Sequence, residues 1–102
     1  MTQFDVEAFI KEQWPSDLPL RNLATENDVE IATLYYGGDF KIIFDPRNEK
    51  ELEAAKVAFN RLKEQGFLAF NVTDKSKPGE QISTFDPTKG SYIMMPPVAG
   101  GK

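Results

Sequence analysis

The stretch NEKELEAAKVAFNRLKEQG, residues 48–66, contains the signals of an amphipathic helix together with both of its ends. Apolar residues recur at spacings of three and four and form one stripe that is expected to face a sheet: Leu52, Ala55, Phe59 and Leu62. Asn48 is a good N-cap, and Glu51 occupies the capping-box position three residues later. Gly66 followed by Phe67 predicts a Schellman ending. The sequence therefore predicts a helix from Asn48 to Gln65.

A β-hairpin is expected immediately before this helix. Residues Val29 to Tyr36 alternate between two faces, which is typical of a strand. Gly37-Gly38-Asp39 then suits a hairpin turn, because glycine accepts the positive φ that such turns require. The return strand, Phe40 to Phe44, is expected to turn Phe40, Ile42 and Phe44 inward.

Three further strands are expected after the helix. Phe67 to Thr73 has apolar residues on both faces, which favours an interior position and a right-handed βαβ crossover from the hairpin. Gln81 to Phe85 and Ser91 to Met95 follow as shorter strands. The triplet Phe-Asp-Pro ends a strand at 44–46 and again at 85–87, where the aspartate is expected to form an Asx-turn.

The N-terminal segment Thr2 to Trp14 is expected to be a second helix, capped by Thr2 with Asp5 three residues later. Its apolar residues share one broad face: Phe4, Val6, Phe9, Ile10 and Trp14. Burial of such residues is strongly favourable, so docking on the domain's own core is favoured over docking on a partner. The fold class predicted is α+β: a small mixed sheet with one crossing helix plus an N-terminal helix, in a single compact domain of residues 1–95.

Composition excludes several kinds of function. The chain has 102 residues, a net charge of −4, no histidine and no cysteine. A histidine-based nucleophilic triad, a typical zinc site and disulfides are thereby excluded, and no cofactor is expected. Scattered basic residues argue against nucleic-acid binding, and no apolar run is long enough to span a membrane. The absence of cysteine fits a reducing compartment, so a cytoplasmic protein is expected.

Acidic residues offer only weak candidates for chemistry. Asp39, Asp45 and Asp86 would have to meet at one sheet edge to hold a cation, and turn formation is the favoured explanation for all three. Glu49, Glu51 and Glu53 lie at a helix start, where the helix dipole favours negative charge.

The chain ends in a segment unlike the rest, PPVAGGK at residues 96–102. Pro96 and Pro97 fix φ and remove backbone donors, so the last strand should end there and the chain should leave stiffly. Gly100 and Gly101 lack Cβ atoms and allow close approach of another protein's backbone. Such a tail suits threading into a narrow active site, although small residues also collect at ordinary loose termini.

Pro96-Pro97-Val98-Ala99-Gly100-Gly101 resembles the ending of the molybdopterin synthase small subunit and, more broadly, the tails of ubiquitin-like and sulfur-carrier proteins. The resemblance implies a β-grasp fold and a protein that is not an enzyme but the substrate of an activating enzyme. Gly101 would be adenylated and then converted to a thiocarboxylate or joined to an amine, with Gly100 as its slim neighbour. Residues 96–99 would form the stalk, and a tail-processing peptidase would first remove Lys102.

A second hypothesis remains open from a different class. The chain could be a small structural or adaptor protein, such as a virion or mobile-element accessory protein, that acts by protein–protein contact. Adjacent strand residues face opposite ways, so one member of each of the pairs Tyr35-Tyr36 and Met94-Met95 is expected to face outward. The expected partner contacts are Trp14, Tyr36 and Met94.

Overall fold

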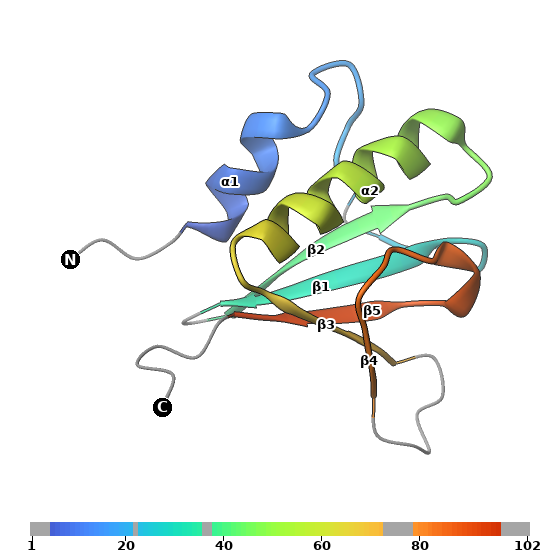
Figure 1. The fold of residues 1–102 in the computed structure, drawn as a ribbon. Helices are drawn as coiled ribbons and strands as arrows, with labels where there is room; N and C mark the ends of the chain where they lie inside the picture. The colour runs from blue at the N-terminus through green and yellow to red at the C-terminus, as the bar shows by residue number, and fades with distance from the viewer. Residues whose placement is uncertain (1–4, 22, 36–37, 73–78, 97–102) are drawn as a thin grey trace, which may run out of the picture.

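The computed structural model describes residues 5–21, 23–35, 38–72 and 79–96. Two α-helices, a short 3-10 helix and five strands form within these residues (Figure 1). Their bounds in chain order are α1 Val6–Gln13, β1 Val29–Tyr35, β2 Gly38–Phe44, α2 Glu49–Glu64, β3 Leu68–Asn71, β4 Glu80–Ile82, η1 Pro87–Lys89 and β5 Tyr92–Met95. The fold class predicted from the sequence, α+β with a mixed sheet, is confirmed.

The strands form one mixed sheet in the order β2-β1-β5-β3-β4. β1 runs parallel to β5, whereas the pairs β1–β2, β3–β5 and β3–β4 are antiparallel. It follows that β2 and β3 run in the same direction, so α2 connects two parallel strands as expected. β1 and β5 lie between those two strands, and β3 has the interior position that its two apolar faces predict.

The ends of α2 follow the expected chemistry, with one change. The Asn48 side chain accepts from the backbone N–H groups of Lys50 and Glu51, at 3.0 and 3.2 Å. Glu51 does not complete a reciprocal capping box, because its carboxylate accepts instead from the backbone N–H of Asp45 at 2.7 Å. At the other end, the N–H of Phe67 donates to the carbonyl of Leu62 at 3.1 Å, which is the long hydrogen bond of the Schellman motif.

Helix α1 is shorter than the sequence predicts. It begins at Val6, and the Asp5 side chain caps it by accepting from the N–H of Ala8 at 3.1 Å. The prediction that Thr2 caps this helix is therefore wrong; Thr2 itself lies outside the described residues. Val6, Ile10 and Trp14 are buried in the common core, which confirms that this face docks on the domain itself.

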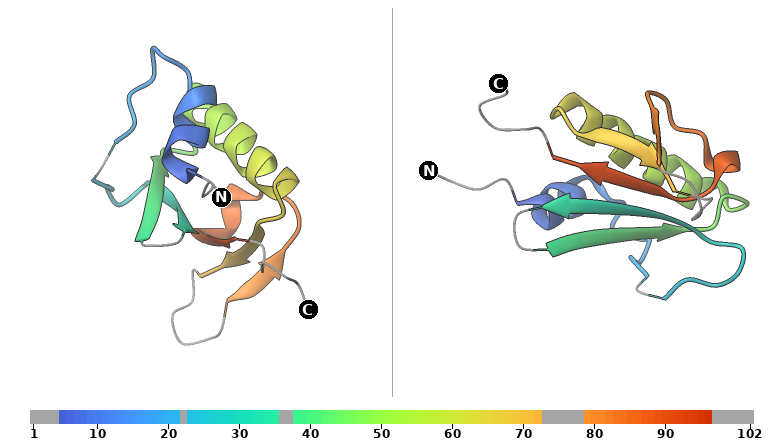
Figure 2. Two further views of the ribbon diagram at one scale, coloured as in Figure 1. Left: turned by 90° about the vertical axis from the view of Figure 1, so that its left-hand side faces the viewer. Right: turned by 90° about the horizontal axis from the view of Figure 1, so that it is seen from below.

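Both helices lie on the same face of the sheet (Figures 1 and 2). The alternative arrangement, in which one helix covers each face, is thus excluded. The core between helices and sheet includes the following fully buried side chains: Ile10, Ile31, Ile42, Phe44, Phe59, Leu62, Tyr92 and Met94. The opposite face of the sheet is covered by neither helix.

Strand β2 begins two residues earlier than the sequence predicts. Tyr35 pairs with Gly38, so Gly38 begins β2 and the expected Gly37-Gly38-Asp39 turn is wrong; Gly37 lies outside the described residues. Ile42 and Phe44 face the helices, so Ile43, which lies between them, faces the opposite side of the sheet. Ile43 is nevertheless buried, although it does not belong to the core between helices and sheet. Phe40 is only half-buried at this end of the strand.

Both Asp-Pro sequences form the turns expected of them. Asp45 accepts from the N–H of Arg47 at 2.9 Å, and Asp86 accepts from the N–H of Thr88 at 3.1 Å. The second turn continues into η1, directly before β5. Within the described residues, the helices are too short and too polar for any of them to cross a membrane.

Candidate functional site

The tail begins at the end of the central strand β5. This strand is bonded to β1 on one side and to β3 on the other, and its Tyr92 and Met94 side chains are buried. Met95 and Pro96, which follow, are exposed. The strand that precedes the tail is therefore held in place by hydrogen bonds to two neighbouring strands and by two buried side chains. The rest of the tail, Pro97, Val98, Ala99, Gly100, Gly101 and Lys102, lies outside the described residues.

An apolar group of side chains lies beside this base on the uncovered face of the sheet. Leu68 and Met95 are cross-strand partners and are 40% and 43% exposed. Phe70 and Ile93 form another cross-strand pair on the same face and are half-buried. We call these four residues the open-face cluster. Exposed large apolar side chains gathered on one face often mark a contact surface.

Two of the three partner contacts expected from the sequence, Trp14 and Met94, are buried. Met94 is fully buried, and Trp14 is 9% exposed with its indole N–H donating to the carbonyl of Leu18 at 2.8 Å. Tyr36 lies outside the described residues. Met95, the neighbour of Met94, is the member of that pair that faces outward. The open-face cluster is thus a candidate contact surface that the sequence analysis did not single out.

A charged network joins the segment before β1 to the start of α2. Arg21 donates to both carboxylate oxygens of Asp28 at 2.9 Å, and also to Glu51 at 2.7 Å. Asp28 is nearly buried, with 1% of its side chain exposed, and it also accepts from the N–H of Thr25 at 2.7 Å. All these groups have partners, so the network is best explained as a structural clamp that holds the connector against the helix.

The electrostatics of the network follow from these hydrogen bonds. The Arg21 guanidinium and the Thr25 N–H hold the pKa of Asp28 below its ordinary value, against the opposing effect of burial. The same pairing with Asp28 raises the pKa of Arg21. A carboxylate held ionised by an arginine is a poor proton donor at neutral pH, so the network does not resemble a general acid site.

A second buried polar group lies under α2. The Tyr92 hydroxyl accepts from the backbone N–H of Asp86 at 2.8 Å and also contacts the Asp86 carbonyl. Its ring packs against Phe59 and Phe85 at centroid distances of 5.6 and 6.0 Å. Burial raises the pKa of the Tyr92 phenol. The hydroxyl is thus hydrogen-bonded to the backbone of Asp86, and the packing of the ring accounts for the burial of Tyr92.

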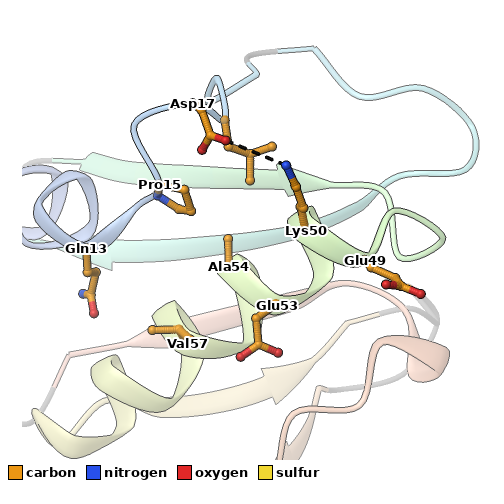
Figure 3. A pocket seen from close by; sticks show the side chains of 9 residues that line it. Gln13, Pro15, Asp17, Glu49, Lys50, Glu53, Ala54 and Val57 are labelled. Atoms are coloured by element: carbon orange, nitrogen blue, oxygen red, sulfur yellow. Dashed lines mark ion pairs between the residues drawn. The ribbon is translucent and has the colours of Figure 1, made fainter.

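An open groove of about 480 Å³ runs between α2 and the segment that follows α1 (Figure 3). Pro15, Leu18, Ala54 and Val57 supply its apolar wall. Charged side chains stand at its rim, where Lys50 approaches Asp17 at 3.8 Å with both side chains largely exposed.

The remaining carboxylates of the groove do not gather at one point. In Figure 3, Glu49 and Glu53 direct their carboxylates away from the pair formed by Asp17 and Lys50. Glu51, the third acidic residue at this helix start, belongs to the Arg21 network instead. The groove therefore has an apolar wall, but its charged side chains do not converge on one point as the groups of an active site would.

No metal centre is found in the parts of the chain that the structure describes. Asp39 lies near the start of β2 and Asp45 follows its end, so these carboxylates lie at opposite ends of one strand. The idea that Asp39, Asp45 and Asp86 share a cation is therefore wrong, and the turn function of Asp45 and Asp86 accounts for them.

Comparison with known proteins yields no relative: no family model, curated protein or solved structure matches the chain.

Sequence reasoning missed both the open-face cluster and the Arg21 network. The alternation of Leu68 and Phe70 in β3 signals a second apolar face, but only the tertiary arrangement reveals that both helices leave it uncovered. Arg21 and Glu51 are thirty residues apart, so no local pattern connects them.

Proposed function

We propose that this chain is a ubiquitin-like or sulfur-carrier protein with a β-grasp fold, whose C-terminal tail is activated at Gly101 after removal of Lys102. In the activation step the Gly101 carboxylate attacks the α-phosphate of ATP on an activating enzyme, and pyrophosphate leaves. A sulfur or amine nucleophile then displaces AMP and leaves a thiocarboxylate or an amide. The chain supplies the reacting carboxylate, and the partner enzyme supplies the catalytic groups.

The position of β5 is the observation that carries this proposal. The last strand lies in the centre of the sheet, parallel to the first, so the tail leaves a strand that is bonded on both sides. Such anchoring gives the tail a fixed starting point, which favours productive entry into a partner's active site. The resemblance of the tail implies a β-grasp fold. Such a fold would also require a hairpin, a crossing helix and a last strand in the centre of the sheet.

The open-face cluster supports the proposal independently of the tail. An activating enzyme must bind the body of a carrier as well as its last residues. Leu68 and Met95 expose apolar surface next to Pro96, where a partner that holds the tail would also touch the sheet. Apolar side chains at the centre of an interface commonly supply most of its binding energy.

Paired truncations test the proposed reaction. ATP–pyrophosphate exchange is measured in extracts of the native host with a chain that ends at Gly101 and with one that ends at Gly100. We expect exchange with the first and none with the second, while both retain the same folded fluorescence of Trp14. Full exchange with the chain that ends at Gly100 would refute the assignment of Gly101.

A structural or adaptor role is the second candidate, and the open-face cluster favours it as well. In that case the exposed pair Leu68 and Met95 would bind a protein partner while the tail plays no part. A stoichiometric complex that survives deletion of residues 97–102, but is lost in the double variant Leu68→Ser/Met95→Ser, would support this role. Loss of the complex on tail deletion would exclude it.

A further inference from the structure

The outer edge of β2 is unpaired among the described strands, because β2 is the last strand in the order β2-β1-β5-β3-β4. The right-hand view of Figure 2 shows β2 along the outer side of the sheet. With seven residues, β2 is much longer than the opposite edge strand β4, which has three. An unpaired edge presents backbone N–H and C=O groups that can bind another strand.

The hairpin register identifies which backbone groups face outward. Tyr35 pairs with Gly38 across two intervening residues, and the pair that closes a two-residue loop is a hydrogen-bonded pair. Bonded and non-bonded pairs alternate along an antiparallel ladder. The N–H and C=O groups of Asp39, Lys41 and Ile43 therefore point away from β1, toward the free edge.

We propose that two copies of this chain pair antiparallel through β2, about a two-fold axis at Phe40, and so join their sheets into one. In this register Asp39 of one copy lies opposite Lys41 of the other, and the symmetry repeats the pair. Both side chains are exposed, and both lie on the face of the sheet away from the helices. Phe40 lies opposite its own copy on the helix side, where it is half-buried.

Charge complementarity selects this register over its neighbours. An axis at Asp39 would place two aspartates opposite each other, and an axis at Lys41 would place two lysines opposite each other. Opposite charges across a ladder stabilise the pairing, like charges weaken it, and aromatic pairs add to it. All three axes bring outward-facing backbone groups together, but only the axis at Phe40 also gives two opposite-charge pairs and an aromatic pair.

Self-pairing of this kind does not depend on the proposed function. None of the tail residues takes part, and the open-face cluster lies on β3 and β5, on the other side of β1. Failure of the tail experiments would thus leave the dimer untouched, and failure of the dimer experiments would leave the tail proposal untouched.

Charge-swap variants of the full chain test the proposal by analytical ultracentrifugation over a concentration series. We expect a concentration-dependent dimer for the unsubstituted chain. Asp39→Lys or Lys41→Asp alone makes both symmetric pairs like-charged and should raise the dimer dissociation constant about tenfold or more. The double variant Asp39→Lys/Lys41→Asp restores opposite charges and should restore the dimer. Glu53→Lys, an exposed helix position with the same charge change as Asp39→Lys, serves as the matched control.

Amide hydrogen exchange provides a second measurement. It reports whether the backbone N–H groups are hydrogen-bonded, which a change of side-chain charge alone does not alter. The outward N–H groups of Asp39 and Lys41 should exchange slowly at dimer-forming concentrations and rapidly on dilution. A monomer at all concentrations would overturn the proposal. A dimer that tolerates both single swaps, or one that is lost in Leu68→Ser/Met95→Ser instead, would place the contact elsewhere and overturn it too.

Discussion

Replacing Thr33 with valine should stabilise this protein. Thr33 lies at the centre of β1, opposite Phe40 of β2 and Met94 of β5, and its side chain is fully buried. Its hydroxyl Oγ1 has no hydrogen-bond partner within the described part of the chain. A buried hydroxyl without a partner costs about 1–3 kcal/mol, because it gives up water on folding and gains nothing in exchange.

The magnitude follows from the shape of the two side chains. Valine replaces the hydroxyl with a methyl group of similar size, so the packing against Phe40 and Met94 is kept and the unpaired polar atom is removed. Valine is also at least as favourable as threonine in a strand. We expect the free energy of unfolding to rise by about 1–2 kcal/mol.

Urea unfolding followed by the fluorescence of Trp14, the single tryptophan, measures this change. An increase of that size moves the urea midpoint upward by about 1 M for a chain of this length. Thr33→Ser is the matched control: it keeps the hydroxyl, loses a methyl group and should be less stable than the unsubstituted chain. A Thr33→Val protein less stable than the unsubstituted one would refute the reasoning, since it would mean that the hydroxyl has a partner worth more than its burial costs.

Three further predictions concern the clamp and the helix end. Arg21→Met should lower the free energy of unfolding by about 2–3 kcal/mol in urea melts, because it leaves the nearly buried Asp28 carboxylate without its guanidinium; Arg47→Met, which breaks only the largely exposed contact to Asp45, should change little. The folded-state pKa of Asp28 is lowered, so its stabilising contribution is complete above the ordinary value of 3.8 and is lost as pH falls through the lower folded value. Acid titration of Trp14 fluorescence should accordingly show a shallower loss of stability below pH 3.8 in Arg21→Met, and an unchanged slope would contradict the assignment of that effect to Arg21. Gly66→Ala should cost about 1 kcal/mol in thermal or urea melts, because Gly66 has a φ of 97° at the end of α2; Gln65→Ala, one residue earlier, is the control and should be nearly neutral.

The elements with strong local signals could be predicted from the sequence. Asn48 and Gly66 mark the two ends of α2 through backbone bonds made within a few residues, so the structure agrees with them closely. Thr2 and Asp5 are both good capping residues, so the sequence pattern alone does not distinguish between them, and in the structure Asp5 caps α1 while Val6, the first residue of the helix, is buried.

The arrangement of elements in space depends on contacts that no local pattern contains. The spacing of apolar residues in the sequence predicts the apolar faces of α1 and α2. Their placement on the same side of the sheet follows from tertiary packing around Phe59 and Ile10. The clamp depends on Arg21 meeting Asp28 and Glu51, which requires the connector to fold back on α2. Because Met94 and Met95 alternate along a strand, the sequence predicted that one faces outward, and only the topology shows that it is Met95.

The most direct test of the proposed function is intact-mass spectrometry of this protein recovered from its native host. The proposal predicts a mass that lacks Lys102, together with a species in which sulfur replaces one oxygen of the Gly101 carboxylate or in which Gly101 is joined to an amine. A single unmodified mass that retains Lys102, with all of the protein in one stable complex, would contradict it and favour the structural or adaptor role.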